Sequence, residues 1–228
     1  MRVVREMPAL PAALDREVER LWAVAQARLD GRLFNGQVFS VDVLTPHLLC
    51  GHWTEFRRIV AQMHRHDLFG VLGVRPLAVG GLIVGPDGIV FGRRPAQAVY
   101  QAGEWQLAPA GSVDAGSAGH EGVVDWRRQL LAELEEELGM PAASVEVGRP
   151  ICVVEHAGSH VLDLGVMLRS DWPASRIRAA HAAGGNGEYA PLEIVPLDGL
   201  VAFMGRVGPL LNRQARVFLA RSGLMAAR

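Results

Sequence analysis

The sequence contains no lysine, because all 23 basic residues among its 228 residues are arginine. This absence excludes a P-loop lysine that binds phosphate, a lysine that forms a Schiff base, and a lysine general base. Arginine would have to provide any recognition of phosphate. Its planar guanidinium group suits that task.

The chain also carries almost no net charge and has only two cysteines. The formal charge is −1, so no overall field favours nucleic acid or an anionic membrane. The two cysteines, Cys50 and Cys152, form no C-x-x-C pair, so we expect free thiols rather than disulfides or a cysteine-rich zinc site. No apolar run reaches about 18 residues, and the N-terminus does not resemble a signal peptide. We therefore expect a cytoplasmic protein without membrane or nucleic-acid partners.

Hydrophobic residues make up 50% of the chain and charged residues 21%, which is typical of a globular protein. Hydrophobic spacing predicts an N-terminal α+β lobe over residues 1–74. Its expected elements are a helix at 12–30, a strand at 37–43, and a helix at 54–65 with Thr54 as its N-cap. This lobe contains no obvious chemical motif.

Residues 75–228 are predicted to form a second domain of mixed strands and helices. A hairpin is expected first, with strands at 77–84 and 89–93 joined by a Gly-Pro-Asp-Gly turn. The other expected elements are strands at 105–107, 143–147, 150–155, 160–168 and 192–196, helices at 125–138 and 207–221, and a Gly/Ala-rich loop at 174–187.

Three glutamates, Glu133, Glu136 and Glu137, share one face of the predicted helix at 125–138, because residues three and four apart are neighbours on a helix. Their mutual repulsion would be removed by a divalent cation, and Mg²⁺ prefers carboxylate oxygens together with substrate phosphates. The alternative is an acidic, solvated helix surface. The triplet alone does not decide between the two interpretations.

The segment from Ala132 to Met140 resembles the second half of the Nudix box, G-x5-E-x7-R-E-U-x-E-E-x-G-U, in which U is aliphatic. It reads A-E-L-E-E-E-L-G-M. The first half resembles the box at Gly111, which follows Pro109 and Ala110 as in Nudix enzymes that act on nucleoside diphosphate sugars. The resemblance implies an α/β/α sandwich, with a mixed sheet between helices, over roughly residues 75–200.

The sequence departs from the box at two positions. Ser117 stands where the signature has a glutamate, and Ala132 stands where it has an arginine. The loop before the helix is also about seven residues longer than the signature allows. The two missing residues pair with each other in the family, so losing both leaves no orphan charge. Arg127, Arg128 or Glu121 could form a contact that supports the box in the same way as this pair.

By this resemblance, Glu133, Glu136 and Glu137 would bind Mg²⁺ or Mn²⁺, and the carbonyl of Ala110 could add a ligand. The implied reaction is metal-assisted hydrolysis of a diphosphate bridge. The general base varies in the family between a glutamate of the helix and a glutamate of a distal loop. Glu188 is the distal candidate, with a surface acid as the alternative.

Substrate contacts are predicted from the hairpin and the strand that follows it. Arg93 and Arg94 end the hairpin and could clamp phosphate, or could be solvated charges. Trp105 could stack on a base or belong to the core. Gly111 would line the substrate site.

The Pro-Ala-Gly loop, the lengthened box and the N-terminal lobe favour a nucleoside diphosphate sugar as substrate, of the UDP-glucose, UDP-galactose or ADP-ribose type. The products would be a nucleoside monophosphate and a sugar phosphate. A Nudix domain that binds a ligand without hydrolysing it is the alternative, and the variant box favours it. The apolar final helix is compatible with a homodimer or with core packing.

Overall fold

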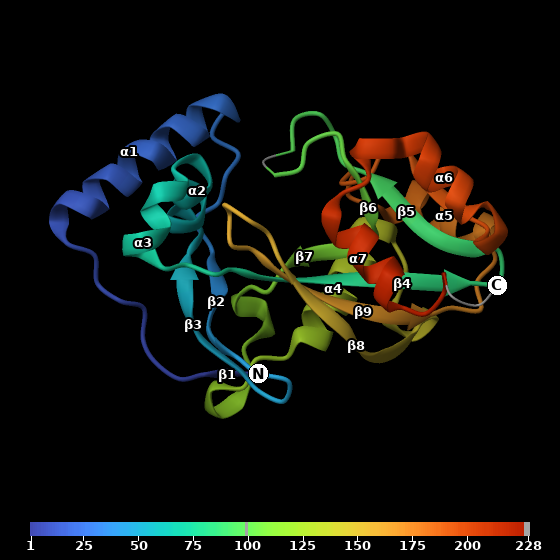
Figure 1. Cartoon of the computed structure of the whole chain (residues 1–228), viewed down its shortest axis with the longest axis horizontal. Coiled ribbons are helices and arrows are strands. Elements are labelled where there is room, and N and C mark those ends of the chain that lie inside the picture. The colour runs from blue at the N-terminus through green and yellow to red at the C-terminus, as the bar shows by residue number, and fades with distance from the viewer. Residues whose placement is uncertain (99, 226–228) are drawn as a thin grey trace. The chain divides into compact units, whose positions relative to one another are not determined.

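The computed structural model describes residues 1–98 and 100–225 (Figure 1). The chain divides into two compact units. The N-terminal unit comprises Met1–Ala78, Ser112–Gln129 and Glu155–Leu162, and the C-terminal unit comprises Val79–Gly111, Leu130–Val154 and Asp163–Arg228. The N-terminal unit therefore includes two later segments in addition to the first 78 residues. The expectation of domains at 1–74 and 75–228 stays a prediction.

The N-terminal unit is built on a three-stranded sheet with the order β1-β3-β2, in which β1 is parallel and β2 antiparallel to β3. Its elements are β1 (Arg2–Val3), α1 (Ala12–Arg28), β2 (Gln37–Leu44), β3 (Leu49–Glu55), α2 (Phe56–His64), α3 (Phe69–Leu72) and the 3-10 turns His66–Leu68, Ala115–Ser117 and His120–Gly122. Helices α1 and α2 pack through their apolar stripes, where Val18 and Leu21 of α1 and Ala61 of α2 are buried in one cluster.

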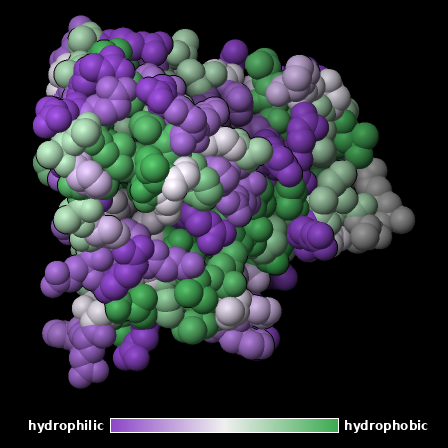
Figure 2. Space-filling view, turned by 60° about the vertical axis from the view of Figure 1, so that its left-hand side comes forward, coloured by the Kyte–Doolittle hydropathy of each residue, from purple (hydrophilic) through white to green (hydrophobic). Residues whose placement is uncertain are grey.

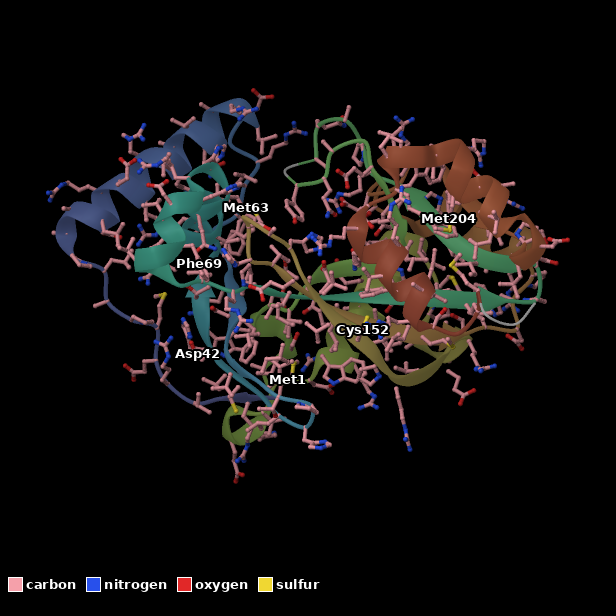
Figure 3. The ribbon with its side chains drawn as sticks, in the orientation of Figure 1. Met1, Asp42, Met63, Phe69, Cys152 and Met204 are labelled. Carbon is pink, nitrogen blue, oxygen red and sulfur yellow. The ribbon has the colours of Figure 1, made fainter. Side chains whose placement is uncertain are left out.

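A polar cluster links strands β2 and β3 with the start of the chain. Asp42, labelled in Figure 3, accepts hydrogen bonds from Arg5 at 2.6 and 2.8 Å and lies 3.0 Å from Nδ1 of the buried His52. Burial opposes ionisation of Asp42, but the hydrogen bonds from Arg5 and His52 outweigh it and lower its pKa. For His52, burial disfavours the charged form and lowers the pKa, against the attraction of Asp42.

The C-terminal unit is built on a seven-stranded sheet with the order β10-β5-β4-β9-β8, to which β6 adds beside β5 and β7 beside β4. Its strands are β4 (Leu77–Gly85), β5 (Gly88–Arg93), β6 (Trp105–Leu107), β7 (Ala110–Ser112), β8 (Glu146–Glu155), β9 (Leu162–Arg169) and β10 (Leu192–Val195). The hairpin of β4 and β5 and the strand at 105–107 were predicted from the sequence and are confirmed.

The helices of this part of the chain are α4 (Trp126–Leu138), α5 (Ala174–Gly184), α6 (Leu200–Val207) and α7 (Arg213–Arg221), with 3-10 turns at Ala142–Ser144, Leu197–Gly199 and Gly208–Leu210. Phe203 of α6 and Phe218 of α7 pack against Leu82 and Phe91 of the sheet. The chain is thus of the α/β class, with sheets flanked by helices, as the sequence predicted.

Two predicted elements of the C-terminal half are wrong. The Gly/Ala-rich segment expected to be a loop contains helix α5, because its alanines favour helix and Ile177 buries one face. The helix expected at 207–221 begins only at Arg213. Helix α6 ends at Val207, because Gly208 adopts a positive φ of 49° and Pro209 follows it.

Two further corrections concern strands. Residues 143–147 and 150–155 were expected to be separate strands but form one strand, β8, after a 3-10 turn. Pro150 does not interrupt it because β8 lies at the sheet edge, where a missing N–H is tolerated. Thr54 is not an N-cap: it lies inside β3, and α2 begins at Phe56.

Cys50 and Cys152 are free thiols, as predicted. Cys50 is buried, and Cys152, labelled in Figure 3, is half-buried. In the described residues, no helix is long and apolar enough to cross a membrane. Hydrophilic and hydrophobic residues are interspersed on the face shown in Figure 2. The apolar residues of the final helix are explained by packing, since Phe218 and Leu219 are fully buried in the core. A homodimer stays a prediction.

Candidate active site

Helix α4 carries the three predicted carboxylates, and local signals fix both of its ends. Asp125 caps it by accepting the N–H groups of Arg127 and Arg128 at 3.0 and 3.2 Å. Gly139 ends it with a positive φ of 64°. The apolar stripe predicted for this helix is fully buried and consists of Leu130, Leu134 and Leu138.

The three carboxylates of α4 differ in exposure. Glu136 is exposed and Glu133 is half-buried, whereas Glu137 is only 3% exposed. Oε2 of Glu137 accepts the backbone N–H of Ala110 at 2.9 Å and the hydroxyl of Tyr189 at 3.1 Å. Both of these hydrogen bonds fall on the same oxygen, Oε2.

The pKa of Glu137 is raised well above its usual value. Burial is the largest cause, followed by the negative charge of Glu133, and the charge of Glu188 adds to the effect. The hydrogen bonds from Ala110 and Tyr189 act in the opposite direction. Burial and the negative charges of Glu133 and Glu188 thus oppose ionisation of Glu137 more than its two hydrogen bonds favour it.

Gly111 allows Glu133 to approach the loop before β7. A Cβ atom at residue 111 would lie 1.9 Å from Oε1 and 2.1 Å from Cδ of Glu133. The carboxylate of Glu133 thus occupies the space that any other residue would fill. This contact brings together the two halves of the sequence motif.

The distal candidate Glu188 forms an ion pair with Arg94 at 2.7 Å, and both side chains are largely buried. Arg94 also donates to the carbonyl of Tyr100 at 3.0 Å, and Arg93 donates to the carbonyl of Gly103 at 3.0 Å. Both arginines therefore brace the loop between β5 and β6. Since Glu188 also contributes to the field at Glu137, it lies on the same side of the unit as the carboxylates of α4.

Trp105 lies in the hydrophobic core. Its side chain is 6% exposed and its ring meets Phe203 edge to face, with centroids 5.5 Å apart. These contacts favour the core interpretation of Trp105 over a platform for a base.

The sequence did not reveal the brace that replaces the missing glutamate and arginine. The hydroxyl of the buried Ser117 donates to Oε1 of Gln129 at 2.6 Å, and the same oxygen accepts the N–H of Asp114 at 3.2 Å. Arg127, Arg128 and Glu121 were the expected candidates. A neutral hydrogen bond inside the N-terminal unit therefore ties the lengthened loop to the first turn of α4.

Tyr189 and Gln106 were also missed. Tyr189 follows Glu188 directly and is fully buried, with its hydroxyl 2.7 Å from Nε2 of Gln106. The sequence offered only one signal for Tyr189, its position beside a candidate acid. No signal marked Gln106, which alternates with apolar residues in a short strand.

The donor set suits a hard divalent cation in its chemistry. Glu137 is anchored through one oxygen and offers the other, and a cation would offset the repulsion from Glu133 and Glu188. In residues 1–98 and 100–225, however, no three His, Cys, Asp or Glu side chains already surround one point where a metal ion could bind. The residues therefore fit a metal by donor type rather than by preformed coordination.

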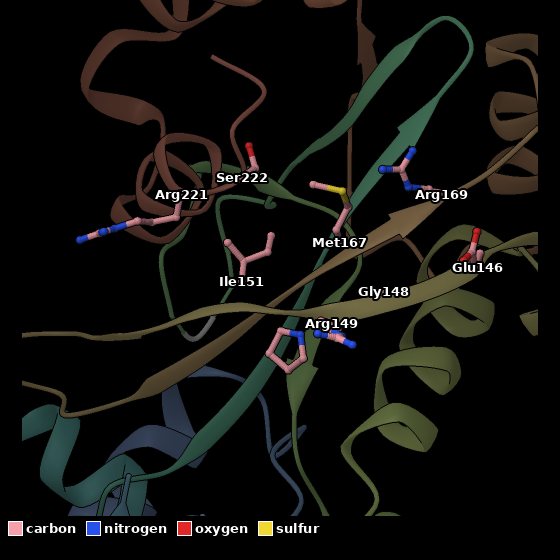
Figure 4. Close-up of a pocket in the computed structure, with 9 residues that line it drawn as sticks. Glu146, Gly148, Arg149, Ile151, Met167, Arg169, Arg221 and Ser222 are labelled. Atoms are coloured by element: carbon pink, nitrogen blue, oxygen red, sulfur yellow. The ribbon is translucent and has the colours of Figure 1, made fainter. Parts of the chain in front are cut away.

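A concavity of about 410 Å³ lies elsewhere in the C-terminal unit, between β8, β9 and the end of α7 (Figure 4). Ile151 and Met167 form its middle, and Arg149, Arg169 and Arg221 are at its margins. None of the candidate site residues lines it. The carboxylate cluster and this concavity are thus separate features.

No family profile matches the sequence, and no curated protein matches it. Solved structures do match, each at low identity. A Nudix hydrolase from M. smegmatis, RenU, is 19% identical over 67% of this chain and 86% of its own, with a TM-score of 0.46. An ADP-ribose pyrophosphatase from Streptococcus suis is 20% identical over 68% and 93%, with a TM-score of 0.42.

The Nudix domain of NrtR from Shewanella oneidensis, solved with ADP ribose, is 15% identical over 66% of this chain and 89% of its own, with a TM-score of 0.47. Two of these three structures, RenU and the NrtR domain, are named as Nudix proteins.

Proposed function

We propose that this chain is a metal-dependent pyrophosphohydrolase of the Nudix type. Its substrate would be a nucleoside diphosphate sugar, of the UDP-glucose or UDP-galactose type or ADP-ribose, and its products a nucleoside monophosphate and a sugar phosphate. The observation that carries the proposal is the buried carboxylate of Glu137, which the N–H of Ala110 holds at 2.9 Å in the field of Glu133 and Glu188. Such a group suits a site that handles cations and phosphate.

Glu133, Glu136 and Glu137 would hold Mg²⁺ or Mn²⁺, with the carbonyl of Ala110 as a further ligand. When bound, such an ion polarises the diphosphate and neutralises the charge that develops on the leaving phosphate. The absence of a side chain at Gly111 keeps the carboxylate of Glu133 close to this loop.

Side chains of the protein would perform the proton transfer and the recognition of phosphate. Water adds to one phosphorus, the bridging P–O bond breaks, and Glu188 accepts the proton that the water loses. In the resting protein Arg94 forms an ion pair with Glu188 at 2.7 Å. Arg93 and Arg94 are the candidates for phosphate recognition. Arg94 would exchange the carboxylate of Glu188 for a phosphate oxygen.

The test is turnover of a panel of UDP-glucose, ADP-ribose, GDP-mannose, thiamine diphosphate and a nucleoside triphosphate, with Mg²⁺ or Mn²⁺. Glu136→Gln should reduce turnover by about 10²-fold or more. Glu135→Gln is the matched control, since Glu135 is exposed on the same helix but lies off the carboxylate face. Equal activity of the two variants would contradict the proposal. So would a protein that hydrolyses other compounds of the panel but no nucleoside diphosphate sugar.

A ligand-binding module that does not hydrolyse is the second candidate. Ala132 and Ser117 support it, because the charged pair of the box is replaced by the Ser117–Gln129 hydrogen bond. Folded protein that turns over nothing in the panel, yet binds one of its compounds in calorimetry equally well after Glu136→Gln, would establish this alternative.

A further inference from the structure

Four neighbouring polar side chains lie inside the C-terminal unit, where apolar residues would otherwise be expected. Tyr189, Gln106, Asn212 and Gln214 are each at most 3% exposed. Buried polar groups cost free energy unless they are hydrogen-bonded, so a connected set of them calls for a reason. The hydrogen bonds of Asn212, Gln106 and Tyr189 lead to the carboxylate of Glu137.

The N-terminus of α7 fixes the donor and acceptor of each hydrogen bond that links Asn212, Gln106 and Tyr189. The backbone N–H of Ala215 can only donate, so the atom of Asn212 that faces it, at 2.8 Å, is Oδ1. Nδ2 of Asn212 therefore points the other way, 3.0 Å from Oε1 of Gln101 and 3.5 Å from Oε1 of Gln106. This orientation leaves Nε2 of Gln106 directed at Tyr189.

Gln106 in turn orients the hydroxyl of Tyr189. Nε2 of Gln106 donates to the Tyr189 oxygen at 2.7 Å, so the single proton of that hydroxyl is available for Oε2 of Glu137, 3.1 Å away. Asn212, Gln106 and Tyr189 thus form a relay of fixed polarity. It delivers one donor to the carboxylate, and the N–H of Ala110 delivers the second to the same oxygen.

The ring of Tyr189 is itself held in place. A Cβ atom at Gly92 would lie 2.3 Å from ring atoms of Tyr189, so the ring lies directly against the backbone of β5. The segment after Tyr189 is bonded to the same strand. The N–H of Ala190 donates to the carbonyl of Arg93 at 2.9 Å, and the N–H of Arg93 donates to the carbonyl of Pro191 at 3.0 Å. The hydroxyl therefore has little freedom to leave Glu137.

We propose that Tyr189 is a positioning residue that anchors Oε2 of Glu137 and leaves Oε1 for the metal ion, and that Gln106 sets the direction of the Tyr189 hydroxyl. This inference rests on the proposed function, because it assigns a purpose to Glu137. Two donors on one oxygen restrict rotation of the carboxylate. Outer partners of this kind affect metal affinity by 10- to 100-fold in known metal sites.

The test measures Mn²⁺ binding without substrate, from the loss of the electron paramagnetic resonance signal of free Mn²⁺. Tyr189→Phe removes only the hydroxyl and should raise the Kd for Mn²⁺ about tenfold or more. Gln106→Met should act in the same direction. Ser144→Ala is the matched control, because it also deletes a buried hydroxyl in the C-terminal unit, one that donates to the carbonyl of Pro141 at 2.6 Å.

Kinetics provide a second readout, which a merely structural role would not move. For Tyr189→Phe we expect the Mn²⁺ concentration needed for half-maximal rate to rise about tenfold, with KM for the nucleotide nearly unchanged at saturating Mn²⁺. If Tyr189→Phe fails to fold, as judged by circular dichroism, Gln106→Met carries the same two measurements.

The outcomes separate the two proposals. Unchanged Mn²⁺ affinity in both folded variants, beside a wild type that binds Mn²⁺ and hydrolyses a substrate, overturns the positioning role and leaves the proposed function intact. A wild type that neither binds Mn²⁺ nor hydrolyses any substrate overturns the proposed function, and the positioning role with it. Weakened binding in Tyr189→Phe but not in Ser144→Ala supports both.

Discussion

Substituting alanine for Gly111 should separate activity from stability. The new Cβ would lie 1.9 Å from Oε1 of Glu133, whereas ordinary contacts begin at 3.4 Å, so the carboxylate must retreat by about 1.5 Å. The atoms that must move are the far end of a flexible side chain, and residue 111 has no backbone conformation that excludes alanine. We therefore expect the free energy of unfolding to change by about 1 kcal/mol or less.

The effect on activity should be much larger, because a displacement of about 1 Å at a catalytic group can cost about 10²-fold in rate. The assay compares kcat/KM for the best substrate of the panel with chemical denaturation of the same samples. Gly205→Ala is the matched control. Gly205 lies in α6 with nothing within 4 Å of an added Cβ, so that change should leave activity intact and raise stability by about 0.5–1 kcal/mol.

A contrasting glycine lies at residue 92. There an added Cβ would come within 2.3 Å of Cγ and Cδ1 of Tyr189, which belong to a buried ring and cannot swing away. Gly92→Ala should therefore lower the free energy of unfolding by about 1–3 kcal/mol, the usual cost of overpacking. If Gly111→Ala kept full activity, or lost as much stability as Gly92→Ala, the position assigned to the Glu133 carboxylate would be wrong.

Two further predictions concern the N-terminal unit. The buried hydroxyl of Thr54 has no hydrogen-bond partner among the residues that the structure describes. Thr54→Val should therefore raise the free energy of unfolding by about 1 kcal/mol in urea titrations, and a decrease would show that this hydroxyl is satisfied. Because the pKa values of Asp42 and His52 are both lowered by folding, their contributions are present at neutral pH. The contribution of His52 should be lost as the pH falls below its ordinary value of 6.5, and that of Asp42 below 3.8. Asp42→Asn, which removes the partner of Arg5, should lower stability at pH 7 and weaken its dependence on pH below 3.8, where Asp42 would be protonated. Parallel curves for the wild type and the variant would contradict this assignment.

The elements that were predictable from the sequence are those whose signals are local. Helix α4 has a cap at Asp125, an apolar stripe at helical spacing and a terminating Gly139, so its limits were predicted to within one residue. The β4–β5 hairpin is likewise determined by its turn, at Gly85 to Gly88. Helix α5 was missed because its glycines and alanines were interpreted as a loop, although alanine is the best helix former.

The properties of the site that were not predictable depend on contacts between distant parts of the chain. Glu136 and Glu137 are adjacent on the same helix face, yet one is exposed and the other buried. The difference arises from the Ala110 loop and from Tyr189, which is 52 residues away from Glu137 along the chain. Periodicity places the carboxylates on one face, but it contains no information about what covers that face.

The division of the chain into two interleaved units has a consequence for biosynthesis. The N-terminal unit needs residues 112–129 and 155–162 as well as the first 78 residues, and the polypeptide between these segments belongs to the other unit. The N–H of Phe39 donates to the carbonyl of Val113 at 2.8 Å, and the side chain of Gln62 donates to the carbonyl of Ser159 at 3.0 Å. The N-terminal unit can therefore not complete its fold on the ribosome until residue 162 has been synthesised, after the first two segments of the C-terminal unit. A shortened chain that begins at residue 75 would contain both inserted segments without the strands and helices that they bond to.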